Sequence, residues 1–235
     1  MGDYLIPLLI IIAAGVIVIL GFDLYSMFVK KPVPEVYMYI TNGRVQMLPW
    51  GMNNYQDAID GMKMLRGDSI KTLKNAKTTI KVFNGIILRM DEDTELYLRD
   101  ISDKSYKTSL SFNLKNGRVW INAAKLSSET DMKIYTNDLI VKSGGGIFGI
   151  EQNNNGIVRS MKGFADVDIV YYQNEELNVY DTVKVGIGQE ISIGKKEINL
   201  YNQNKYPDVL DALSDKFKQE EWYSRNIAQD ALLMR

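Results

Sequence analysis

The order of apolar and polar positions divides the chain into three parts. Residues 4–22 form an uninterrupted apolar run between Asp3 and Asp23. From residue 35 onward, short runs follow in which apolar and polar side chains alternate, as they do along a strand with one buried face. Near the C-terminus the apolar residues recur at helical spacing instead. The pattern predicts a membrane-crossing helix, a mainly β domain and a helical tail.

The N-terminal apolar run is long enough to cross a bilayer, which takes about 20 apolar residues in a helix. No Lys or Arg precedes the run and no small-residue cleavage pattern follows it, so we expect an uncleaved anchor over residues 4–28. Two prolines stiffen a linker over residues 29–35. Lys30 and Lys31 favour a cytoplasmic domain by the positive-inside rule, although two lysines make a weak charge bias.

Asn-Gly dipeptides between alternating runs predict β-hairpins. A two-residue turn at Asn116-Gly117 would pair the strands of residues 110–123 with one apolar face. The same device recurs at Asn42-Gly43 within residues 38–47. A third hairpin is best formed with a three-residue loop over residues 83–85, which aligns the apolar side chains of both strands.

Further short strands follow at even spacing, which is typical of an all-β domain and extends it over residues 36–200. They are expected at residues 132–135, 139–142, 147–151, 156–160, 165–172, 177–180 and 190–193.

The tail, residues 206–235, is predicted to form one interrupted helix or two short ones. Two interpretations of it stay open: it packs on the β domain, or it binds a partner. The same choice applies to Trp120, which falls on the polar face of its strand and is either covered by another layer or exposed as a contact. The candidate partner contacts are Trp120, Trp222 and Tyr223.

Composition removes several kinds of chemistry. The 235 residues include no Cys and no His, which excludes disulfides, thiolate nucleophiles, Ser-His-Asp triads and zinc sites built on these side chains. The formal net charge of −1 gives no basic field for nucleic acid. Carboxylates, Lys, Tyr, Ser and Thr remain for catalysis. We expect no catalytic, cofactor-binding or metal-ligating residues.

Two short motifs suggest ligand sites but have plainer interpretations. Residues 143–146, Ser-Gly-Gly-Gly, lack the Gly-Lys-Ser/Thr ending of a phosphate loop, so a tight connection or bulge is expected. Residues 91–95 lack the ligand spacing and glycine of a calcium loop, so an acidic turn is expected. The carboxylate pairs at residues 175–176 and 220–221 point apart and are expected to be solvated.

Several segments together resemble the FecR domain. They are Gly67-Asp68 with the Thr that follows, residues 79–96 with their Leu-Arg-Met-Asp-Glu core, and residues 117–121 and 161–167. Met90 and Asp93 stand where the family usually has Leu and Asn. The resemblance covers roughly residues 36–193, and its segments occur in the family's order.

This resemblance implies a twisted, solenoid-like or sandwich-like stack of short antiparallel strands outside the cytoplasm of a bacterium. It implies a sensing role and no catalytic residues. Only three residues precede the apolar run, so we expect no sigma-factor-controlling segment in this chain. The family placement outweighs the two lysines, and we expect a single-pass inner-membrane protein with an extracytoplasmic C-terminal domain.

The leading functional hypothesis is a membrane-anchored, non-enzymatic module of the cell envelope that binds or scaffolds a protein or glycan partner. The alternative is an extracytoplasmic sensor that works through a separate membrane or regulatory protein. A third class, an enzyme that uses carboxylates alone, would need two acidic side chains converging in a cleft.

Overall fold

A computed structural model describes residue 21 and residues 35–82, 85–104, 107–124 and 130–233. The chain divides into two units, Met1–Val33 and Pro34–Arg235, and the description below concerns the second. The predicted anchor and linker lie outside the described residues, apart from Gly21 and residue 35. Among the helices that the structure does describe, none combines the length and the apolar character needed to cross a membrane.

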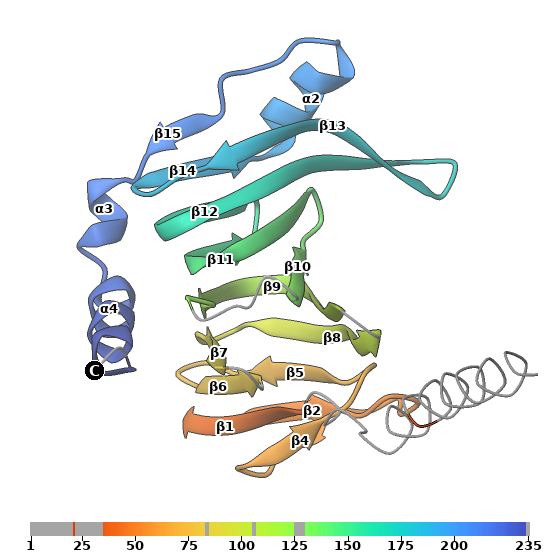
Figure 1. Ribbon diagram of the computed structural model, residues 1–235, viewed down its shortest axis with the longest axis vertical. Helices are drawn as coiled ribbons and strands as arrows, with labels where there is room; N and C mark the ends of the chain where they lie inside the picture. Colours follow the sequence, from red (N-terminus) through yellow and green to blue (C-terminus); the bar gives the residue numbers. More distant parts are fainter. Residues whose placement is uncertain (1–20, 22–34, 83–84, 105–106, 125–129, 234–235) are drawn as a thin grey trace, which may run out of the picture. The chain divides into compact units, whose positions relative to one another are not determined.

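The described part is mainly β, with three short helices toward the C-terminus (Figure 1). Its fifteen described strands belong to one hydrogen-bonded sheet, in which ten strands form a path of neighbours and five pair off that path. The strands are β1 Val36–Asn42, β2 Val45–Leu48, β3 Gln56–Asp57, β4 Met62–Met64, β5 Ser69–Thr72, β6 Lys77–Val82, β7 Ile86–Met90, β8 Glu95–Lys104, β9 Lys107–Asn122, β10 Thr130–Tyr135, β11 Leu139–Gln152, β12 Gly156–Gln173, β13 Glu176–Val185, β14 Gln189–Ile193 and β15 Leu210–Ala212; the helices are α2 Lys195–Asn202, α3 Asp215–Lys218 and α4 Glu221–Leu233.

The pairings resolve into two layers that share the long strands β9, β11 and β12. The first layer runs β3-β2-β5-β8-β9-β10-β11-β12-β13 and uses the first half of β9. The second layer runs β4-β1-β6-β7-β9-β11-β12-β14-β15 and uses the second half of β9. One continuous apolar core takes side chains from both layers. Figure 1 shows the strands stacked as rungs from β1 and β4 to β14 and β15.

The corner in β9 depends on Gly117. Its φ of +89° lies in the left-handed region, and a Cβ there would come within 2.3 Å of the Thr94 Oγ1. Before this corner Leu110, Phe112 and Leu114 lie in the core. After it, the alternate residues Val119 and Ile121 also lie in the core. The chain thus changes layers while it keeps the same face buried.

Two hairpin predictions are wrong for this reason. The expected hairpin at Asn116-Gly117 is a corner within the single strand β9. Likewise, β1 and β2 flank Asn42-Gly43 but pair with other strands, β1 with β4 and β6, and β2 with β3 and β5. The inward faces were predicted correctly, but a corner and a hairpin bury the same apolar side chains, so the alternation could not distinguish them.

Other predictions from the pattern are confirmed. β6 and β7 pair with Val82 opposite Ile86, as the three-residue loop over residues 83–85 requires, although residues 83 and 84 lie outside the described part. Residues 143–146 form an irregularity in the β11–β12 pairing, where the register shifts. The strands pair antiparallel in every described case except β9 with β10, which run parallel.

The C-terminal region differs in detail from the expected helical tail. Leu210 lies in strand β15 rather than in a helix, and α3 is a single turn capped by Ser214, whose Oγ accepts from the Phe217 N–H. The two short helices were predicted, whereas α2 was not. α2 is rich in charged and polar residues, and its only fully buried residue is Tyr201, so it carries no apolar stripe for a pattern to detect.

Replacing Gly117 by Ala tests the corner. The variant should lower the free energy of unfolding by about 2–4 kcal/mol, because it combines a left-handed backbone with a clash against Thr94. Gly144→Ala is the matched control, since a Cβ at Gly144 meets nothing within 4 Å, and it should change stability by less than about 0.5 kcal/mol. Urea denaturation of the purified chain measures both; equal effects of the two variants would contradict the assignment.

Candidate functional site

β7 and β9 present charged and aromatic side chains on the face of the second layer that points away from the core. Along β9, Val119 and Ile121 lie in the core, so alternation turns Arg118 and Trp120 outward. On β7, Arg89 lies directly across from Trp120 in the strand register. These outward side chains belong to the segments that carry the FecR resemblance.

Helices α3 and α4 cover this face with an aromatic cluster made of Trp120, Phe217, Trp222 and Tyr223. The Trp120 ring lies 5.4 Å from the Trp222 ring and 6.0 Å from the Tyr223 ring, both in edge-on geometry. Trp120 is fully buried and Trp222 is 4% exposed. Since aromatic side chains bury the largest apolar areas, the cluster supplies much of the energy that holds α4 in place.

A buried carboxylate on α4, that of Asp230, binds the sheet. Its Oδ2 accepts a hydrogen bond of 2.8 Å from the Trp120 Nε1, and its Oδ1 lies 2.8 Å from the Arg89 Nη1. The second contact is an ion pair without the alignment of a hydrogen bond. Asp230 is 1% exposed, so both sheet partners are needed to offset the cost of removing its charge from water. Asn226 adds its Oδ1, 3.4 Å from the same Arg89 nitrogen.

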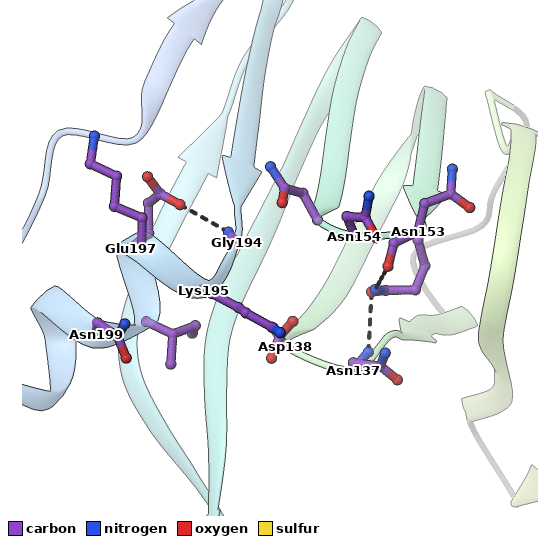
Figure 2. A pocket seen from close by; sticks show the side chains of 12 residues that line it. Asn137, Asp138, Asn153, Asn154, Gly194, Lys195, Glu197 and Asn199 are labelled. Carbon is purple, nitrogen blue, oxygen red and sulfur yellow. Dashed lines mark hydrogen bonds between the residues drawn. The ribbon is translucent and has the colours of Figure 1, made fainter.

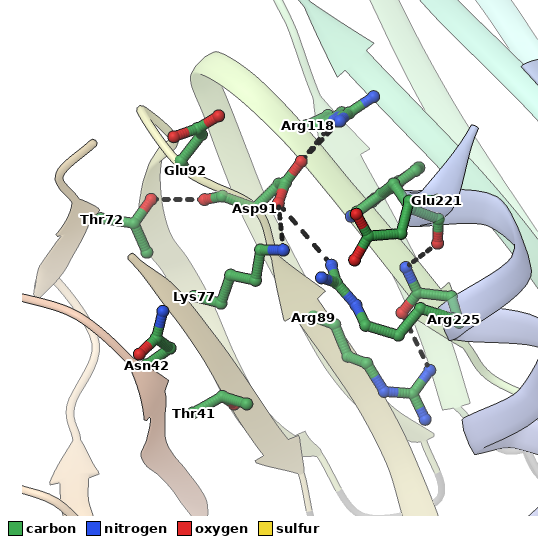
Figure 3. A network of polar contacts seen from close by, with 12 residues as sticks. Thr41, Asn42, Thr72, Lys77, Arg89, Asp91, Glu92, Arg118, Glu221 and Arg225 are labelled. Atoms are coloured by element: carbon green, nitrogen blue, oxygen red, sulfur yellow. Dashed lines mark hydrogen bonds and ion pairs between the residues drawn. The ribbon is translucent and has the colours of Figure 1, made fainter. Parts of the chain in front are cut away.

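A second polar group centres on Asp91, just after β7 (Figure 3). Its carboxylate lies 2.6 Å from the Arg118 Nη2, 3.7 Å from the Arg225 Nη2 and 3.8 Å from the Lys77 Nζ. Arg118 also pairs with Glu220 at 2.5 Å. Sheet and helix thus contribute charges of both signs, and the Asp91 group joins β7, β9 and α4 at the end of the helix opposite Asp230.

Arg118 lies where these contacts meet. Burial disfavours its charged form, but the carboxylates of Asp91 and Glu220 outweigh burial and raise the pKa of the guanidinium above its ordinary value. The guanidinium also lies 4.7 Å from the centre of the Trp222 ring, a cation–π distance. Arg118 therefore stays charged at all physiological pH values and stabilises both the polar and the aromatic contacts of α4.

The three predicted contact residues are therefore brought together in one internal interface. The interpretation that Trp120 is covered by another layer is confirmed, and so is the interpretation that the tail packs on the β domain. Contact of Trp120, Trp222 and Tyr223 with a partner stays a prediction, and in this arrangement it would require α4 to leave the sheet.

Sequence reasoning missed the charged residues of this site. Asp91 was expected in an acidic turn, and its burial and pairing were not foreseen: it is 4% exposed and paired with Arg118. The carboxylate of Glu220, expected in solvent, pairs with Arg118. Arg89 lies next to Trp120 in the sheet but more than a hundred residues from its partner Asp230, so no local spacing reveals the pair. One sequence signal could have indicated these contacts: Arg89 and Arg118 are charged residues within strands whose neighbouring residues lie in the core.

A separate cleft of about 860 Å³ lies between the β10–β11 connection, the β11–β12 turn and the start of α2 (Figure 2). Amides dominate its lining, from Asn137, Asn153, Asn154, Asn155 and Asn199. Such groups donate and accept hydrogen bonds without charge, which suits a neutral polar ligand.

The two carboxylates at this cleft are not an acid/base pair. Burial raises the pKa of Asp138, whereas Glu197 accepts a 3.0 Å hydrogen bond from the Gly194 N–H and so caps α2. Figure 2 shows Glu197 turned toward Gly194 and the Lys195 side chain directed to Asp138. Among the described residues, no group of three or more acidic side chains is placed to hold a metal ion.

One family model matches part of the chain. The family model described as "FecR protein" matches residues 68–163, so the resemblance is confirmed over this part of the chain. The matched segment contains Arg89, Asp91, Arg118 and Trp120, whereas their partners on α4 lie outside it. No curated protein matches the chain.

Solved structures give weaker similarity. Two crystal structures named as a putative anti-sigma factor from Parabacteroides distasonis ATCC 8503 match with TM-scores of 0.41 and identities of 12% and 11%. Each match covers 57% of this chain and 64% of the other, so the chain spans less than two thirds of that structure's length. Similarity at this level establishes neither a shared fold nor a shared function.

Replacing Asp230 by Ala tests the helix–sheet contact. The variant leaves Arg89 as an uncompensated buried charge, so it should cost about 3–5 kcal/mol of unfolding free energy. Tryptophan emission should also shift to longer wavelength, because Trp120 and Trp222 become hydrated. Asp211→Ala, at an exposed position on β15, should do neither. A variant at Asp230 that matched this control in both measurements would contradict the assigned role.

Proposed function

We propose, from the FecR domain at residues 68–163, that this protein is a non-enzymatic signalling component of the bacterial cell envelope. In this role the β domain senses a condition or ligand, and a separate membrane or regulatory protein transmits the response. The family match supports the regulatory class of function. The existence of a separate protein partner and the membrane anchor are further parts of the proposal.

The observation that carries this proposal is that polar side chains of the FecR segment bind the C-terminal region of the same chain. Arg89 and Trp120 direct their polar groups to Asp230 on α4, and Arg118 pairs with Glu220, the residue just before that helix. None of these contacts forms a reactive centre. A domain whose family-matched residues hold a helix in place is suited to pass a change in the β domain to that helix. It is not suited to bond-making chemistry, which needs free reactive groups.

The side-chain inventory supports the same class. The sequence has neither Cys nor His, the usual nucleophile and general base. The buried acidic residues Asp68, Asp91, Asp168 and Asp230 all have hydrogen-bond or ion-pair partners within the described structure. A carboxylate enzyme of the kind considered from the sequence would need a free convergent pair.

Location enters as a second part of the proposal. We place residues 4–22 in the inner membrane as a single helix, with the β domain on the outer side, on the strength of the apolar run and the family's usual location. Lys30 and Lys31 argue the other way. Protease added to intact spheroplasts should digest the β domain, and its protection would overturn this orientation.

The competing function is a static envelope scaffold. A scaffold supports the envelope directly, so its loss need not change transcription, whereas loss of a sensor should change it. Deletion of the gene in the bacterium that carries it, followed by complementation, separates the two functions.

For a signalling role, deletion should change a small, discrete set of transcripts, and the wild-type chain should restore them. The Asp211→Ala chain should restore them as well, whereas Asp230→Ala should not, because it loosens the helix that we assign to transmission. An unchanged transcript profile alongside a defect in the envelope would refute signalling and favour the scaffold.

A further inference from the structure

The outer face of the first layer, which belongs to neither site above, carries a hollow of about 650 Å³. Its floor comes from Tyr97 on β8 and Asn113 on β9, which lie directly opposite each other in the register. Their strand neighbours Leu96, Leu98, Phe112 and Leu114 are core residues, so Tyr97 and Asn113 point away from the core. The wall is formed by Trp50, Arg66, Gly67 and Arg99.

Trp50 is exposed yet held in position. Trp50 is 77% exposed, the largest exposed fraction among the large hydrophobic residues of the described chain. Its backbone N–H donates to the Asp68 Oδ1 at 2.9 Å, and the Leu65 N–H donates to the Oδ2 at 2.7 Å. Asp68 is only 3% exposed, so one buried carboxylate ties together the two loops that frame the hollow.

Gly67 brings the indole close to the backbone. A Cβ at this position would lie 2.2 Å from the Trp50 Cδ1, and its φ is +97°. The Gly67 N–H also donates to the Leu98 carbonyl at 2.8 Å, which fixes the loop to β8. The indole therefore packs against backbone that is hydrogen-bonded to β8, which limits the entropy that a ligand loses in ordering it.

Two arginines border the same hollow. Arg99 is the extra residue of a bulge in β8, where the register passes from Leu98 to Asp100, and bulges re-aim side chains. Its guanidinium lies 4.3 Å from the centre of the Tyr135 ring, and no described carboxylate forms an ion pair with it. Arg66 has an exposed side chain whose only described ion pair, to Asp100, is long at 3.7 Å. Both cations are thus available to an anion.

We propose that this hollow binds an acidic saccharide, one whose sugar rings carry carboxylate groups. The flat face of a sugar ring lies on the Trp50 indole, and the carboxylate is bound by the forked donors of Arg66 and Arg99. The amide of Asn113 and the phenol of Tyr97 bind hydroxyl groups. A hollow of this size falls within the usual range of ligand sites.

The same features disfavour the other anionic polymers. Nucleic acid binding relies on many phosphate contacts, whereas this hollow offers two arginines on a chain of net charge −1. An acidic peptide would be recognised through strand pairing or side-chain pockets, and here the bound face is a sheet surface with a single aromatic platform. The inference uses a site separate from the α4 interface, so it stands whether or not the protein signals.

Direct titration of the purified full-length chain tests it. The probe is a short oligogalacturonate, and its methyl ester is the matched neutral probe, because it keeps the rings and removes the charges. Tryptophan fluorescence and calorimetry both report binding; Trp50 dominates the fluorescence change because Trp120 and Trp222 are buried. Oligogalacturonate should bind, its ester should bind at least about tenfold more weakly, and added salt should weaken binding.

Three variants assign the contacts. Trp50→Ala should weaken binding at least about tenfold in calorimetry, as loss of a central aromatic contact does. Arg66→Gln with Arg99→Gln should have a similar effect and abolish the preference for the acid over the ester. Gly67→Ala adds only a methyl group, and its clash with the indole should displace Trp50 and weaken binding. Tyr206→Ala and Arg44→Gln, an exposed aromatic residue and an exposed arginine that do not line the hollow, should leave binding unchanged.

Four results would overturn the proposal. They are no binding of oligogalacturonate at millimolar concentration, equal binding of the acid and the ester, equal binding of a pentaglutamate peptide or a short single-stranded oligonucleotide, and unchanged binding by a folded Trp50→Ala chain. Circular dichroism of each variant separates a lost contact from a lost fold. A failure here with an intact transcriptional response would leave the proposed function standing.

Discussion

The charge of Asp230 is the constraint on which the C-terminal part of the structure depends. A carboxylate that is 1% exposed persists only where polar partners compensate its charge. Arg89 and Trp120 provide this from adjacent positions on two paired strands. The position of α4 follows from that geometry, and the aromatic cluster around Trp222 then excludes water from the pair. Stability and position are thus set by the same few contacts.

The two layers divide the work of the domain. Corners in the long strands let the chain pass between layers while both layers share one core. The two outer faces differ in what covers them. The second layer's face is covered by α4 and carries the polar residues of the FecR segment. The first layer's face stays open around Trp50 and its arginines. The proposed ligand contact and the helix contact therefore lie on the outer faces of different layers around one core.

Alternation along the chain predicted the strands, their inward faces and the outward position of Trp120. It failed on pairing at Gly117, because a corner and a hairpin bury the same side chains. It also failed on α2 and on Asp91, since neither a polar helix nor a buried charge leaves a periodic signal. The Arg89–Asp230 pair joins strand and tail across more than a hundred residues, and that information exists only once the sheet has formed.

The account's central claim is that the FecR segment and α4 are energetically coupled. A double-mutant cycle with Arg89→Met and Asp230→Leu measures this coupling directly, using unfolding free energies of the wild type, both single variants and the double variant. We predict that the double variant loses less stability than the sum of the single variants by about 2 kcal/mol or more, because each single change strands a buried charge. Additive losses, equal to within about 0.5 kcal/mol, would contradict the account.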